Sequence, residues 1–93
     1  MMYGIVTDKD NFVMDNMKDP SGEPRKGTLV FKKKSDAVSE CDYLNSIRHR
    51  MKISQCYSVS KFTEENLTDY GIILDGKWQR SLKCTTTFDQ LVQ

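Results

Sequence analysis

The side chains best suited to catalysis are few in this chain and stand far apart. Its 93 residues include one histidine, His49, and three cysteines, at 41, 56 and 84. A nucleophile needs a base within hydrogen-bond reach, but Cys56 is separated from His49 by an expected turn. No nucleophile elbow, phosphate-binding glycine loop or H-E-x-x-H pattern occurs. We therefore expect a protein that is not an enzyme and uses no cofactor.

The cysteines do not predict a metal site or a disulfide framework. Three thiols cannot pair completely, none lies in a C-x-x-C spacing, and with one histidine they match no known zinc pattern. We interpret all three as small buried apolar residues. The longest apolar runs, GIV and GIIL, fall far short of the roughly 20 residues of a membrane span, and no export signal is present. This pattern predicts a cytoplasmic protein without a membrane contact.

Basic residues form two segments, 25–34 and 48–52, within a chain whose net charge is +1. Between them lies an expected helix that rises 1.5 Å per residue, so Lys34 and Arg48 would stand roughly 20 Å apart. No continuous basic patch follows, and no known nucleic-acid motif occurs. A nucleic-acid-binding protein is therefore the alternative function. Its contacts would be Lys32, Lys33, Lys34, Arg48, Arg50 and Lys52.

Recognition of a protein partner is the leading prediction. Trp, Tyr and Arg dominate the energetics of protein interfaces, and Trp78, Arg80 and Tyr70 lie in or beside an expected hairpin. Arg25 and Lys26 belong to a predicted loop, 18–27, that could also contact a partner. The serine-rich stretch 54–60 is a third candidate surface, and a second copy of the chain is one candidate partner because an edge strand can pair. The competing interpretation makes Trp78 the largest core residue.

One helix is predicted over residues 36–49, with Ser35 as its N-cap and Asp36 in its first turn. Ala37, Cys41 and further apolar residues at 38, 44, 47 and 51 recur at helical intervals and form one stripe. Polar residues at 39, 42, 46 and 49 would face solvent. This stripe predicts that the helix packs along one side against a sheet.

Strands are predicted on both sides of this helix. Residues 3–7 and 12–15 indicate a hairpin, 18–27 a long loop, 28–32 a strand, and 53–60 a strand with alternating faces. Thr63 could cap a helical turn, and Asp75-Gly76 predicts a two-residue hairpin that places Ile73 opposite Trp78. Phe88, Leu91 and Val92 suggest that the end of the chain docks. Residues 3–12 and 70–78 both run Tyr-Gly-Ile-aliphatic-x-Asp and reach an aromatic after the turn.

Together these elements predict a single α+β domain over residues 1–93, with an antiparallel sheet of four to six strands and the helix on one face. In general plan the chain resembles small accessory proteins encoded by bacteriophages, which have fewer than a hundred residues, a few strands, one helix and no catalytic motif. That resemblance implies a protein that inhibits or modulates a host enzyme or defence component by contact. It does not extend to DNA mimics, which are strongly acidic, whereas this chain is nearly neutral.

Overall fold

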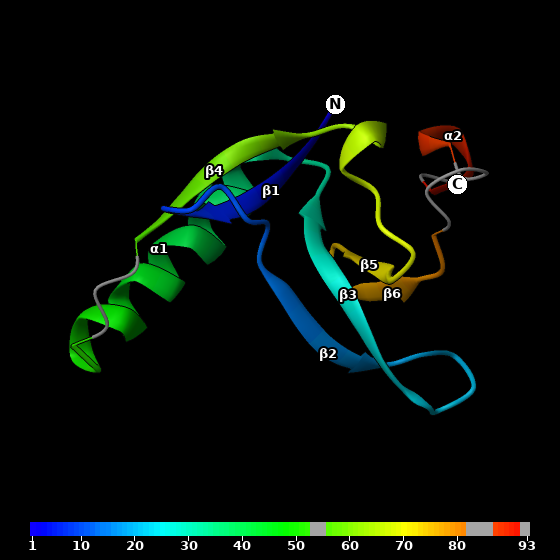
Figure 1. The fold of residues 1–93 in the computed structure, drawn as a ribbon, viewed down its shortest axis with the longest axis horizontal. Coiled ribbons are helices and arrows are strands. Elements are labelled where there is room, and N and C mark those ends of the chain that lie inside the picture. The colour runs from blue at the N-terminus through cyan, green and yellow to red at the C-terminus, as the bar shows by residue number, and fades with distance from the viewer. Residues whose placement is uncertain (53–55, 82–86, 92–93) are drawn as a thin grey trace.

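The computed structural model, which describes residues 1–52, 56–81 and 87–91, has the predicted α+β fold (Figure 1). A six-stranded, mostly antiparallel sheet carries one main helix on one face. The elements in chain order are β1 (Met2–Thr7), β2 (Met14–Lys18), β3 (Pro24–Phe31), α1 (Lys34–Arg50), β4 (Tyr57–Phe62), the 3₁₀ turn η1 (Glu64–Asn66), β5 (Gly71–Leu74), β6 (Lys77–Gln79) and α2 (Phe88–Leu91).

Strand β3 is the centre of the sheet. The strand order is β4-β1-β3-β5-β6. β1 and β2 share one edge of β3: β2 pairs with the first part of β3, and β1 pairs with the last part of β3. β5 pairs with the other edge of β3 in parallel. The prediction of an antiparallel sheet did not include this parallel pair. It arises because the chain passes through α1, β4 and η1 before it returns beside β3.

The N-terminal strands depart from the predicted arrangement. Val6 and Phe12 form one isolated bridge, and β2 then leaves to pair with β3. The ten-residue loop expected over 18–27 is wrong, because Lys18 ends β2 and Pro24 already begins β3. Pro24 occupies the first strand position, where its missing amide hydrogen is tolerated. The connection is therefore a tight turn inside a β-hairpin, and it holds Arg25 and Lys26 on a strand.

Helix α1 is longer than predicted and begins differently. Its N-cap is Lys33, with no side-chain capping bond, so Ser35 lies inside the first turn and the predicted cap is wrong. Ala37 and Cys41 are buried, but Val38 and Met51, at the edge and end of the predicted stripe, are exposed. The helix contacts β4, β1 and β3, and this contact covers only part of the stripe.

Asn45 joins α1 to the start of β4. Its Nδ2 donates to the backbone oxygen of Tyr57 at 3.1 Å, and its Oδ1 accepts from the Tyr57 amide at 3.0 Å. A side-chain amide carries one donor and one acceptor group and can therefore satisfy both backbone polar groups of one residue. Asn45 thus satisfies the backbone of Tyr57 as a neighbouring strand would, and these two hydrogen bonds tie α1 to the first residue of β4.

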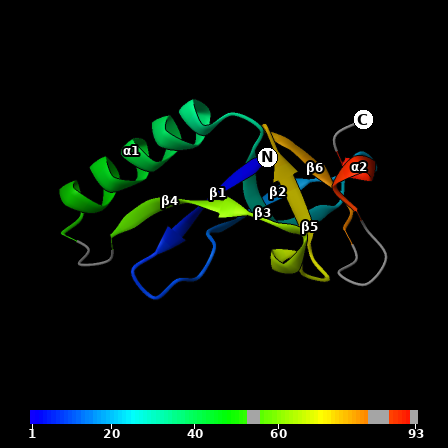
Figure 2. The same cartoon turned by 90° about the horizontal axis from the view of Figure 1, so that it is seen from above.

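The main hydrophobic core lies on the sheet face opposite α1. It comprises Met2, Val30, Phe62, Leu67, Ile72, Leu74 and Leu91, with Phe12 and Phe88 packed against it. Side chains alternate across a strand, so Ile5, between Gly4 and Val6 on β1, points to the α1 side. Figure 2 shows α1 on one side of the sheet and η1 on the other. The predicted docking of Phe88 and Leu91 is confirmed; Val92 lies outside the described residues.

The segments around β4 and η1 contain one confirmed and one corrected prediction. Thr63 is the N-cap of η1, as predicted, and its amide donates to Asn66 Oδ1 at 2.9 Å. Cys41 is buried, but Cys56 is exposed just before β4, so the expectation that all three cysteines are buried is wrong. Cys84 and the start of the predicted strand, residues 53–55, lie outside the described residues. Among the described helices, none is long and apolar enough to cross a membrane.

Candidate functional site

The Asp75-Gly76 hairpin places Trp78 on the sheet as the sequence predicts. Asp75 has φ 49° and Gly76 φ 86°, the two positive values that a type I′ turn requires. Ile73 is the partner of Trp78 across the β5–β6 pair. Because β5 is buried along its whole length, the position of the indole is set by an inner strand of the sheet.

Two glycines on neighbouring strands make room for the indole. Gly27 on β3 and Gly71 on β5 are directly paired. A Cβ at Gly71 would overlap the Trp78 ring, and one at Gly27 would lie 3.1 Å from it. The indole Nε1 donates to the Lys26 backbone oxygen at 3.2 Å. Trp78 is half-buried and is not a member of the core cluster, so the interpretation of Trp78 as the largest core residue is wrong.

A hollow of about 280 Å³ opens beside the indole. We call it the Trp78 hollow. Its lining includes all five residues for which the sequence predicts a partner contact, although they come from two distant segments of the chain. The complete lining is Pro24, Arg25, Lys26, Asp69, Tyr70, Gly71, Trp78 and Arg80. The structure thus brings together residues that the sequence analysis could only name separately.

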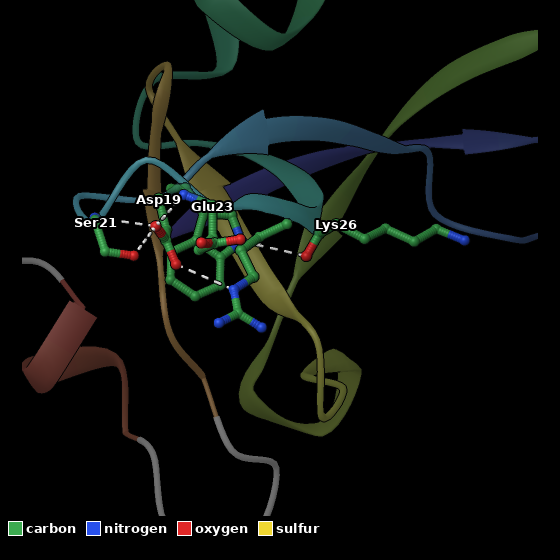
Figure 3. Close-up of polar contacts among 6 residues, drawn as sticks. Asp19, Ser21, Glu23 and Lys26 are labelled. Atoms are coloured by element: carbon green, nitrogen blue, oxygen red, sulfur yellow. Dashed lines mark hydrogen bonds and ion pairs between the residues drawn. The ribbon is translucent and has the colours of Figure 1, made fainter.

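The turn between β2 and β3 holds Arg25, which lines the hollow. Figure 3 shows Asp19, Ser21 and Glu23 of this turn. Asp19 Oδ1 accepts hydrogen bonds from the Ser21 hydroxyl at 2.6 Å and from the amides of Ser21 and Glu23, both at 3.0 Å. Its Oδ2 accepts from Arg25 Nε at 3.0 Å. The Ser21 hydroxyl, then the Arg25 guanidinium and the two amides, lower the pKa of Asp19 to about 2 against the effect of desolvation. The carboxylate therefore stays charged and holds both the turn and Arg25.

Lys26 and Tyr70 form a second contact at the hollow. The Lys26 ammonium lies 5.7 Å from the centre of the Tyr70 ring, within the range of a cation–π interaction. Figure 3 shows that the Lys26 side chain extends away from the Asp19 turn. Tyr70 and Arg80 are exposed, so an aromatic ring and a guanidinium are both accessible at this site.

The residues of the nucleic-acid alternative are not brought together. Lys32, Lys33 and Lys34 stand at the start of α1, whereas Arg48, Arg50 and Lys52 stand at its end. The 17 residues of α1 correspond to roughly 25 Å of helix. Figure 2 shows that α1 is one continuous helix on one side of the sheet, so its two ends are apart. Because the length of the helix separates them, the two basic clusters are separate surfaces.

The single histidine, the buried cysteine and the potential metal ligands of the described residues lie outside the Trp78 hollow or apart from one another. His49 is exposed in the last turn of α1, where a basic side chain complements the helix dipole. Burial, together with the nearby Asp42 carboxylate, raises the pKa of the Cys41 thiol. Across residues 1–52, 56–81 and 87–91, no three His, Cys, Asp or Glu side chains lie close enough together to hold a metal ion.

No model of a protein family matches this chain, and comparisons with curated proteins and with solved structures find no match either. Sequence reasoning had named five of the residues that line the Trp78 hollow but missed the paired glycines that seat the indole. It also missed Asp19, whose spacing to Ser21 and Glu23 in D-P-S-G-E is typical of a turn that an aspartate caps.

Proposed function

We propose that this protein is a non-enzymatic binding module that contacts a protein partner through the Trp78 hollow. One observation carries the proposal: the five residues that the sequence predicts as partner contacts, among them a tryptophan, a tyrosine and two arginines, line one hollow whose floor is fixed by the sheet. Interface hot spots combine a buried or half-buried aromatic anchor with arginine and tyrosine around it. The Trp78 hollow has this composition.

The rigidity of the site supports a role by contact. Trp78 is held by the glycine pair and by its hydrogen bond to Lys26, and Arg25 is held by Asp19. Side chains that are already ordered lose little entropy on binding. In keeping with the resemblance to bacteriophage accessory proteins, the proposed role is to inhibit or modulate a host enzyme or defence component that docks on this surface.

Site-specific photo-cross-linking tests the proposal. A photoreactive phenylalanine analogue replaces Tyr70 at the hollow or, as the control, Tyr43 on α1; the two tyrosines are 56% and 57% exposed. Irradiation follows in an extract of the cells in which the protein acts. We expect a discrete protein adduct from position 70 that position 43 does not give.

Three outcomes of this cross-linking would contradict the proposal. These are the same adducts from both positions, no adduct from position 70, and an adduct with nucleic acid alone. An adduct of twice the mass of the chain would identify a second copy of the protein as the partner.

Nucleic-acid binding is the second candidate, and the Lys26–Tyr70 pair is the observation that favours it. Basic and aromatic side chains combine in sites for single-stranded nucleic acid. Phosphate contacts make affinity fall steeply as salt rises. Titration with duplex and single-stranded oligonucleotides at two salt concentrations separates the candidates, and absence of binding at low salt removes this one.

A further inference from the structure

The charges around the Trp78 hollow are unbalanced. Its lining contains three basic residues, Arg25, Lys26 and Arg80, and one acidic residue, Asp69. Arg25 is paired with Asp19 through Nε, but its side chain is still 48% exposed. Within residues 1–52, 56–81 and 87–91, Arg80 forms no ion pair. An anionic group that enters the hollow would therefore be attracted, and mainly by Arg80 and Lys26.

The Trp78 indole can contribute apolar contact to a ligand but no free hydrogen-bond donor, so the basic side chains must provide the polar contacts. The Trp78 Nε1 group already donates to the Lys26 backbone oxygen, so the indole offers apolar contact area and no free donor. Tyr70 also lines the hollow and is exposed, with its ring next to the Lys26 ammonium. A ligand that fits both features carries a negative charge next to an apolar group.

Size and charge favour a peptide over nucleic acid. Sites for single strands follow a backbone over about 4–16 nucleotides, whereas this hollow measures about 280 Å³ and its lining includes the Asp69 carboxylate. A second hollow, which also has Trp78 in its lining, holds Lys18 and Lys77 together with Asp19. Each hollow therefore has an aspartate in its lining, which disfavours a phosphate backbone, while one or two peptide side chains fit within the Trp78 hollow.

We propose that the Trp78 hollow binds an acidic segment of a protein. The carboxylate of a glutamate or aspartate lies against Arg80 and Lys26, and an adjacent apolar side chain packs on the Trp78 and Tyr70 rings. Asp69 disfavours a run of consecutive carboxylates, so an isolated acidic residue is selected. This inference rests on the proposed function and specifies the chemistry of the partner.

Fluorescence titration tests the inference, because Trp78 is the one tryptophan of the chain. The probes are two blocked tetrapeptides, acetyl-Gly-Glu-Leu-Gly-amide and its Gln counterpart. We expect the Glu peptide to change Trp78 emission and the Gln peptide to bind about tenfold more weakly, as expected for loss of a charge-assisted hydrogen bond. Arg80→Gln should weaken binding of the Glu peptide by about the same factor, and Arg50→Gln, at the end of α1, should not.

Further probes give the results that would overturn the inference. It is wrong if the Glu and Gln peptides bind equally, if neither peptide changes the emission, or if inorganic phosphate or a single-stranded oligothymidine binds more tightly than the Glu peptide. Failure of this inference can be told apart from failure of the proposed function. A protein cross-link from position 70 with no preference for the Glu peptide refutes the acidic ligand alone, whereas the absence of that cross-link refutes protein binding.

Discussion

The two Tyr-Gly-Ile strands of this protein, β1 and β5, lie on either side of β3 and use the same local arrangement. After each strand the chain turns, and an aromatic side chain returns over the glycine. A Cβ at Gly4 would lie 2.7 Å from the Phe12 ring, and one at Gly71 would overlap the Trp78 ring. Alternation along the strands puts the two rings on opposite faces of the sheet.

The surroundings of the two rings differ. Phe12 packs edge-on against Phe62, with ring centres 5.2 Å apart, and belongs to the periphery of the main core. Trp78 has a hollow beside it and cationic residues at its rim. The same pairing of glycine and aromatic therefore builds core on one face and a candidate binding site on the other. Both rings are half-buried, and what separates them is that Phe12 contacts the core through Phe62 whereas a hollow lies beside Trp78.

Truncation of the two rings should give the largest difference. Phe12→Ala leaves a cavity against Phe62, and we expect it to lower the free energy of unfolding by about 3 kcal/mol, the low end for a phenylalanine. Trp78→Ala removes a half-buried ring beside an open hollow, and we expect about 1–2 kcal/mol. Denaturant unfolding followed by circular dichroism measures both. Equal losses would contradict the division into core and site.

Replacing each glycine by alanine should distinguish the Phe12 face from the Trp78 face through the fluorescence emission of Trp78. Gly4→Ala overpacks the Phe12 contact and should lower the free energy of unfolding by about 1–3 kcal/mol, with unchanged Trp78 emission. Gly71→Ala displaces the indole, so the emission should shift to the red as the ring enters water. Each variant is the control for the other. Unchanged emission in Gly71→Ala would show that the indole does not rest on this glycine.

The Asp19 turn should make the site side of the sheet acid-sensitive. The pKa of Asp19 is lowered from 3.8 to about 2, so the stability it contributes is present above pH 3.8 and is lost as pH falls through 2. Asp19→Asn keeps an acceptor but removes the charge. The difference in unfolding midpoint between wild type and Asp19→Asn should therefore shrink between pH 4 and 2. A difference that stays constant would contradict the role of the carboxylate.

Arg80→Gln should have the smallest effect on stability. Arg80 is exposed and forms no ion pair among the described residues, so we expect a change within about 0.5 kcal/mol. The same variant should lose affinity for an acidic peptide. A large loss of stability, measured by denaturant unfolding, would mean that Arg80 supports the fold rather than a ligand.

Local signals in the sequence were sufficient for several elements. Asp75-Gly76 fixed the hairpin and the pairing of Ile73 with Trp78 because few residues accept two positive φ angles. Thr63 marked the start of η1. The class of the fold followed from one helical stripe among alternating strands.

Long-range pairings were beyond these signals. Whether β2 continues to pair with β1 or moves to β3 depends on competing partners, and its own residues do not decide between them. The Gly27–Gly71 pair joins residues far apart in the chain, so neither glycine alone predicts a seat for an indole. The site was predicted as a set of residue types, and its convergence became visible only when β3 and β5 were placed side by side.

Quenching of Trp78 fluorescence tests the central claim, that the ring beside the hollow sits in an accessible, cationic site. Anionic iodide and cationic caesium are compared at equal ionic strength, in wild type and in Arg80→Gln. Relative to a free neutral tryptophan derivative, we expect iodide to quench several-fold more strongly than caesium, with a smaller ratio in the variant, which keeps Arg25 and Lys26. Equal quenching by the two ions in wild type, or stronger quenching by caesium, would contradict the claim.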